Sequence, residues 1–175
     1  RKCLPIYDHI FVGGALSNDF FKAKGYEVGT SLVSNAESSL KDLIGNQKII
    51  LPSDVTVDGP MGRTIKVPGD VEPHEAIMDA GPKSLEDLAP YIARAKSILW
   101  NGPLGNYENG FVEQTERLAK LVSEATAATV IGGGDSVAAI DRIKLDMKHI
   151  FVSTGGGAMI EFLANGTWPG LDVLG

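Results

Sequence analysis

The chain has 175 residues, of which 43% are hydrophobic and 22% charged, as in a globular domain that can bury a core. Its net charge of −6 argues against a nucleic-acid-binding surface, because no basic stripe is available to neutralise phosphates. The single cysteine, Cys3, excludes a disulfide framework, and no apolar run reaches the ~18 residues of a membrane helix. We therefore expect one cytoplasmic domain, residues 1–175, without nucleic-acid or membrane partners.

The first third of the chain alternates short apolar runs with helical patterns. Residues 9–12 predict a buried strand, and apolar spacing over residues 16–24 predicts a helix that ends at Gly25. Residues 34–37 have the pattern of a capping box, which predicts a helix as far as about Ile44. Residues 49–51 predict the next strand.

Residues 54–67 have a different character. Two short runs of β-forming residues flank the turn Gly59-Pro60-Met61-Gly62, which predicts a hairpin-like insertion. Residues 71–78 lack a clear period, and we expect a loop and a short strand there.

Helices and strands alternate again in the second half. Ser84 is the expected N-cap of a helix over residues 84–95, and Pro90 should kink that helix or delay its start. Further strands are predicted at 97–100, 129–131 and 149–152, and further helices at 111–125, 136–144 and 158–163.

Several of these strands are continuous apolar runs, which is typical of a parallel sheet covered on both faces. The predicted fold class is therefore α/β: a doubly wound, Rossmann-like, mainly parallel sheet in three layers, with a small hairpin-like insertion. Ligands of such sheets bind outside the carboxyl ends of the strands. The glycine turns of this chain follow strands, so we expect them to line one crevice.

Glycine is over-represented, with 21 of 175 residues against a usual share of about 7%. The turn over residues 132–136, Gly-Gly-Gly-Asp-Ser, joins a strand to a helix, so its backbone N–H groups can approach an anion at the helix N-terminus. Asp135 suits either an N-cap or a Mg²⁺ ligand. Similar turns at 13–14 and 155–157 make a nucleotide the expected ligand.

Spacing excludes two common phosphate motifs. After Gly132 and Gly134, Val137 stands where a dinucleotide fingerprint needs glycine or alanine, and Ile160 does so after the second glycine cluster. Gly81-Pro82-Lys83-Ser84 lacks the spacing of a P-loop. A nicotinamide-dependent oxidoreductase is therefore disfavoured.

Three motifs stand together in one order: Trp100-Asn101-Gly102-Pro103-Leu104-Gly105, Gly132-Gly133-Gly134-Asp135-Ser136 and Ser153-Thr154-Gly155-Gly156-Gly157-Ala158. With them the chain closely resembles the carboxyl-terminal, nucleotide-binding domain of phosphoglycerate kinase, from about Asp8 to Leu174. That family of glycolytic transferases moves the acyl phosphate of 1,3-bisphosphoglycerate to Mg-ADP, giving 3-phosphoglycerate and ATP.

The resemblance implies a role for each matching residue. The N–H groups of Gly155, Gly156 and Gly157 would contact the phosphoryl group during transfer and form the catalytic set. Glu108 would accept from the ribose hydroxyls, and Asp135 would hold the Mg²⁺. The nucleotide-binding set implied is Gly13, Gly14, Gly81, Asn101, Pro103, Gly105, Glu108, Gly132, Gly133, Gly134, Asp135 and Ser136.

The chain also departs from the family. Ala15 replaces the usual third glycine, Asn106 an apolar residue and Met159 a small polar one, which puts purine packing in question. The amino-terminal domain and the first strand of this domain, with its phosphate-binding lysines, would precede Arg1.

We expect 1,3-bisphosphoglycerate and 3-phosphoglycerate to bind only through that missing domain. The isolated fragment should then be inactive and self-associate through unpaired strand edges, whereas the intact enzyme is expected to be a monomer. The alternative is a stand-alone nucleotide-binding or interaction module without catalysis.

Overall fold

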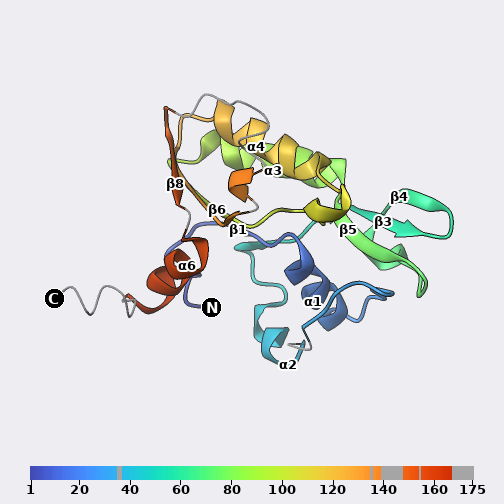
Figure 1. Cartoon of the computed structure of the whole chain (residues 1–175). Helices are drawn as coiled ribbons and strands as arrows, with labels where there is room; N and C mark the ends of the chain where they lie inside the picture. The colour runs from blue at the N-terminus through green and yellow to red at the C-terminus, as the bar shows by residue number, and fades with distance from the viewer. Residues whose placement is uncertain (35–36, 135, 139–147, 154, 167–175) are drawn as a thin grey trace.

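The computed structural model describes residues 1–34, 37–134, 136–138, 148–153 and 155–166 (Figure 1). Its strands are β1 (Ile10–Phe11), β2 (Ile49–Ile50), β3 (Val55–Gly59), β4 (Gly62–Lys66), β5 (Ala76–Ala80), β6 (Ser97–Asn101), β7 (Ala128–Gly132) and β8 (Ile150–Ser153). Its α-helices are α1 (Ala15–Ala23), α2 (Glu37–Leu40), α3 (Pro82–Arg94), α4 (Glu113–Glu124) and α6 (Gly156–Asn165). The 3₁₀ turns are η1 (Lys41–Leu43), η2 (Pro68–Asp70) and η3 (Tyr107–Asn109). Among the described residues, no helix is long and apolar enough to cross a membrane.

The parallel strands lie between helices on two sides, as the sequence predicts. β1 pairs with β2 in parallel, and β6, β7 and β8 form a parallel sheet in that order. Val12 at the end of β1 packs with Phe20 of α1, whereas Leu88 of α3 and Trp100 of β6 share a core with α4. Figure 1 shows α1 and α2 on one side of β1 and the α3–α4 pair on the other. The predicted α/β class and its layers are confirmed.

The described parallel strands do not form one continuous ladder. β1 pairs only with β2, and β6 pairs only with β7. A cavity of about 530 Å³ separates their facing edges, and its lining includes His9, Phe11, Ser97, Ile98 and Leu99. We call this space the edge cavity.

The predicted hairpin is also present. β3 and β4 pair antiparallel with Gly59 opposite Gly62, so Pro60 and Met61 form the turn. β5 adds a third, antiparallel strand beside β3, where the sequence pattern gave only a loop and a short strand. In Figure 1 this β4-β3-β5 sheet projects from the parallel part of the molecule.

Two local predictions need correction. Helix α3 begins at Pro82, with Gly81 as its N-cap, so Ser84 lies within the helix, and Pro90 inside it does not delay its start. The carboxylate of Asp54 accepts from the N–H of Lys83 (3.0 Å) and of Ser84 (2.7 Å), so a distant side chain, and not Ser84, caps the first turn.

The other corrections concern the ends of helices. The helix predicted to run from the capping box to Ile44 is divided into α2 and η1, and the Ser34 hydroxyl donates to Asp19 (2.9 Å). Helix α4 begins two residues later than predicted, because Phe111 belongs to the preceding loop. The helix predicted over residues 136–144 lies largely outside the described residues.

Candidate functional site

The loop that follows β6 connects the two parts of the candidate site. Its first turn is closed by the indole of Trp100, which donates to the carbonyl oxygen of Gly102 (2.7 Å). Gly102 has a φ of 91°, a left-handed conformation that favours glycine. Further on, the Leu104 N–H donates to the hydroxyl of Thr115 in α4 (3.0 Å). The loop is therefore held from both the strand and the helix.

On one side of this loop lies a cavity of about 510 Å³. It collects three of the predicted nucleotide-binding residues, Gly14, Pro103 and Gly105, from two distant segments. Gly14 has a φ of 61°, and a Cβ there would lie 3.1 Å from the carbonyl oxygen of Pro103. We call this part the cavity side; its other lining includes Ala15, Ser17, Asn18, Thr30, Ser31, Leu32, Met78 and Asp79.

On the other side of the loop, three glycines gather around one side chain. The amide oxygen of Asn101 lies 2.9 Å from the point where Gly132 would carry a Cβ, and 2.5 Å from that point at Gly156. A Cβ on Gly156 would also clash with the backbone nitrogen of Gly133. We call Asn101, Gly132, Gly133 and Gly156 the glycine cluster. Close packing explains why positions 132 and 156 hold glycine, and a φ of 94° explains it at Gly133.

The glycine turns also place two helix N-termini at the site. Gly14 is the N-cap of α1 and Gly155 the N-cap of α6, and neither helix has a side-chain cap. Uncapped first-turn N–H groups and the helix dipole both favour a negatively charged ligand.

The remaining predicted residues take different places. Gly13 packs against Leu104, and Gly81 packs against the Asp54 carboxylate rather than on the cavity. Ser136 is fully buried, and its hydroxyl accepts from the Gly102 N–H (2.8 Å). Gly134 and Gly157 have open space where a Cβ would stand.

Glu108 is exposed on η3, and within the described part of the chain its carboxylate makes no hydrogen bond or ion pair. Asp135 lies outside the described residues, so its roles as nucleotide and metal ligand remain predictions.

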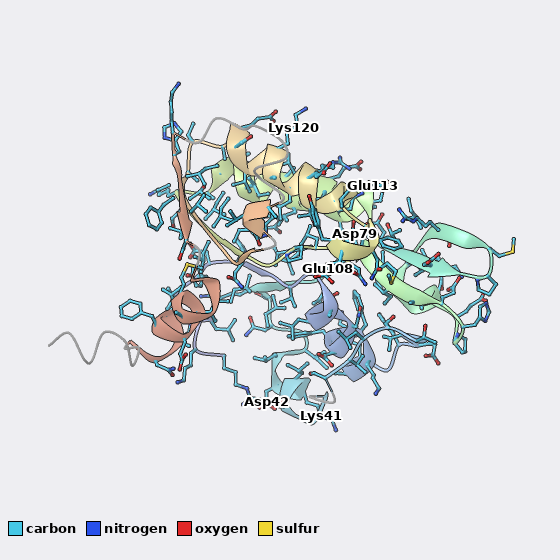
Figure 2. All side chains as sticks on the ribbon, in the orientation of Figure 1. Lys41, Asp42, Asp79, Glu108, Glu113 and Lys120 are labelled. Atoms are coloured by element: carbon cyan, nitrogen blue, oxygen red, sulfur yellow. The ribbon has the colours of Figure 1, made fainter. Side chains whose placement is uncertain are left out.

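Asp79 was not identified from the sequence. Its side chain is 4% exposed, and its carboxylate accepts from the N–H of Ala80 (2.8 Å) and of Gln114 in α4 (3.3 Å). Burial is the main cause that raises the pKa of Asp79 from 3.8 to about 7, and the negative charge of Glu113 adds to it. Figure 2 shows Asp79, Glu108 and Glu113 close together where β5, the loop after β6 and α4 meet.

Asn18 is a second lining residue that the sequence did not reveal. It is 2% exposed, and its amide nitrogen donates to the carbonyl oxygen of Leu32 (3.1 Å). Neither Asn18 nor Asp79 belongs to a short motif, and the chain brings them to the cavity from separate segments. The one local signal was the position of Asp79 two residues before the Gly81-Pro82 turn.

The described residues contain no cluster of three or more His, Cys, Asp or Glu side chains that could hold a metal ion. Mg²⁺ needs no such cluster, because it keeps several waters and often uses one or two carboxylates with substrate phosphates. The predicted ligand Asp135 is a carboxylate of the kind that this donor set uses, but it lies outside the described residues.

Parallel strands between helices, with a cavity and glycine turns after the strands, define an α/β protein of the class that binds ligands at this edge of the sheet. A sequence model of the family described as phosphoglycerate kinase matches residues 1–166. The chain belongs to the phosphoglycerate kinase family.

Individual relatives agree with this assignment. The chain is 39% identical over 178 residues to phosphoglycerate kinase of Baumannia cicadellinicola, covering 99% of this chain and 46% of that protein. It is 39% identical over 190 residues to the enzyme of Mycoplasmoides gallisepticum, with the same coverage. The chain therefore spans about half the length of the curated relatives it matches.

Solved structures show the same likeness. The structure of phosphoglycerate kinase from Coxiella burnetii matches with a TM-score of 0.87 and 36% identity, over 99% of this chain and 47% of that chain. The crystal structure of the enzyme from Pyrococcus horikoshii OT3 matches with a TM-score of 0.86 and 27% identity, over the same shares.

Proposed function

We propose that this chain is the nucleotide-binding lobe of a phosphoglycerate kinase and that it binds Mg-ADP and Mg-ATP. The observation that carries the proposal is the 510 Å³ cavity, which collects Gly14, Pro103 and Gly105 beside the glycine cluster. A cavity of this size, next to uncapped helix N-termini, suits a ligand with an apolar ring and an anionic tail.

In this proposal the two parts of the site have different tasks. The nucleoside lies in the cavity side, and the carboxylate of Glu108 accepts from the ribose hydroxyls. The phosphates lie toward the glycine cluster, where backbone N–H groups of residues 155–157 donate to the phosphoryl oxygens. Such preorganised donors stabilise developing charge without reorganising during the reaction.

The proposed metal ligand is Asp135, which lies outside the described residues. A bound Mg²⁺ would neutralise charge on the nucleotide phosphates. The chain's own contribution is to orient the nucleotide and exclude water around it, and closure against a second lobe would complete the site.

Calorimetric titration of the 175-residue chain with ADP, with and without Mg²⁺, tests this function. We expect saturable binding that weakens at least tenfold in Asp135→Ala and is unchanged in Asp58→Ala, an exposed carboxylate on β3. Absence of binding by a chain with the unfolding transition of a folded domain would contradict the proposal.

A nucleotide-binding module without catalysis is the second candidate. It is favoured by one observation: none of the described residues that line the 510 Å³ cavity is a lysine or an arginine. Phosphoryl transfer depends on cationic groups around the transferred phosphate. A coupled assay with 3-phosphoglycerate and Mg-ATP separates the candidates, and we expect this chain alone to give no turnover.

We also propose that two copies associate through the edges of β1 and β6 that face the edge cavity. Unpaired strand edges are templates for further strands. Sedimentation velocity should show a dimer whose population grows with concentration; a monomer at all concentrations would contradict it. For the intact protein we propose a cytoplasmic monomer that receives 1,3-bisphosphoglycerate through its other domain.

A further inference from the structure

Arg63 of the hairpin β3–β4 contacts the loop that carries Glu108. The guanidinium carbon of Arg63 lies 3.9 Å from the ring centroid of Phe111, a close cation–π contact. The same guanidinium donates to the carbonyl oxygen of Gly110 (3.3 Å). Gly110 has a φ of 78° and ends the 3₁₀ turn η3, of which Glu108 is the middle residue.

The opposite end of this turn is fixed by a different element. The Asn106 N–H donates to the carbonyl oxygen of Met78 in β5 (2.7 Å). Within the turn, Phe111 N–H donates back to the Asn106 carbonyl oxygen (3.1 Å). Glu108 thus stands between one anchor on β5 and another on β4, both in the antiparallel sheet.

Phe111 also connects the second anchor to the cavity. It is 4% exposed, and its carbonyl oxygen packs so closely on Gly105 that a Cβ at Gly105 would clash with it. Gly105 lines the cavity side. A displacement of Phe111 would therefore move both Glu108 and part of the cavity wall.

We propose that Arg63 is a positioning residue for ribose recognition: from the hairpin it holds Phe111 and Gly110, and so presents the Glu108 carboxylate to the ribose hydroxyls. This inference rests on the proposed nucleotide-binding function. It gives the hairpin, which contributes no residue to the predicted site, a part in ligand specificity.

The test compares the binding of Mg-ADP with that of Mg-2′,3′-dideoxy-ADP, which lacks both ribose hydroxyls. For the unmodified chain we expect ADP to bind about tenfold more tightly, as for one hydrogen bond to a charged group. Arg63→Ala should lose most of that preference, with little change in the affinity for dideoxy-ADP. Glu108→Gln should do the same, and the double variant should lose no more than either.

Two variants control for charge and for folding. Arg94→Ala removes an arginine that also lies over a ring, Tyr91 at 5.8 Å, but far along α3, and it should keep the preference. Arg63→Lys retains the positive charge without the planar guanidinium and should recover part of the preference. Thermal melts of all variants establish that the compared chains are folded.

Equal losses of affinity for both nucleotides in Arg63→Ala would overturn the inference, because Arg63 would then support only the fold. An unchanged preference in that variant would also overturn it. If neither nucleotide binds the unmodified chain, the proposed function is contradicted, and the inference with it. If Glu108→Gln keeps the full preference, the proposed role of Glu108 in ribose recognition is contradicted, and so is that of Arg63.

Discussion

The cavity side and the glycine cluster are held together by different kinds of contact. The cavity side is held by side chains that reach across elements: Asp79 of β5 accepts from α4, and Thr115 of α4 accepts from the loop after β6. The glycine cluster is held by backbone packed on backbone around the single amide of Asn101. The difference suits the ligand proposed, since a nucleoside is recognised by shape and a phosphate by N–H groups.

The largest effect should follow a small change in the glycine cluster. In Gly156→Ala the new methyl group would lie 2.5 Å from the Asn101 amide oxygen and against the backbone of Gly133, which cannot move easily. We expect the free energy of unfolding to fall by about 3 kcal/mol and Mg-ADP binding to be lost. Chemical denaturation and calorimetry measure the two effects.

Gly157→Ala is the matched control, because the next glycine of the same helix has nothing within 4 Å of its Cβ position. Its free energy of unfolding should stay within about 0.5 kcal/mol of the unmodified chain. Equal damage in both variants would show that the cluster is not held by backbone contact.

The cavity side should respond to pH through Asp79. Its pKa of about 7 in the folded chain lies above the ordinary value of 3.8, so the folded state keeps a proton that the unfolded state releases. The free energy of unfolding should therefore fall as pH rises from about 4 to about 7, by up to ~1.4 kcal/mol per pH unit, and not below or above that window.

Asp79→Asn removes this titration, so the difference in stability between the two proteins isolates it from other carboxylates. Urea unfolding at several pH values measures that difference. A difference that is constant from pH 4 to 8 would contradict the raised pKa. The measurements are made without nucleotide, so that ligand binding does not contribute to the free energy of unfolding.

Asp54→Ala should have a smaller effect, about 2 kcal/mol off the free energy of unfolding, because it removes the acceptor of two first-turn N–H groups of α3. Asp58→Ala, an exposed change on the strand β3 that follows Asp54, should leave stability unchanged. Thermal melts compare them. Identical melting temperatures for the two variants would show that Asp54 does not cap α3.

The smallest effect is expected on the surface of α3. Lys83 and Asp87 form an ion pair of 2.7 Å with both side chains exposed (64% and 45%), where solvent screens the charges. Lys83→Ala should leave the melting temperature and ADP affinity unchanged. A clear loss of affinity would place Lys83 in the site and contradict the two-part description.

The sequence predicted what depends on neighbouring residues. Apolar spacing located α1 and α4 to within two residues, and the run before Asn101 located β6, since helix and strand periods are local properties. The three glycine motifs likewise pointed to the carboxyl ends of strands.

What the sequence missed depends on residues far apart in the chain. Ser84 was expected to cap α3, but Asp54, 30 residues earlier, reaches that helix in the fold. Asn18 and Asp79 line the cavity with Pro103 only because three segments converge. A short sequence motif cannot show that distant segments line the same cavity. Hydrogen-bond partners at long sequence separation are therefore the part that only the structure supplied.

The most direct test of a site in two parts is a map of backbone amide shifts while the ¹⁵N-labelled 18.5 kDa chain is titrated with Mg-ADP. We predict saturable shifts for Gly14 and Gly105 on the cavity side and for Gly133 and Gly156 in the glycine cluster, with a single dissociation constant. Shifts confined to the edge cavity between β1 and β6, or to only one of the two parts, would contradict the account.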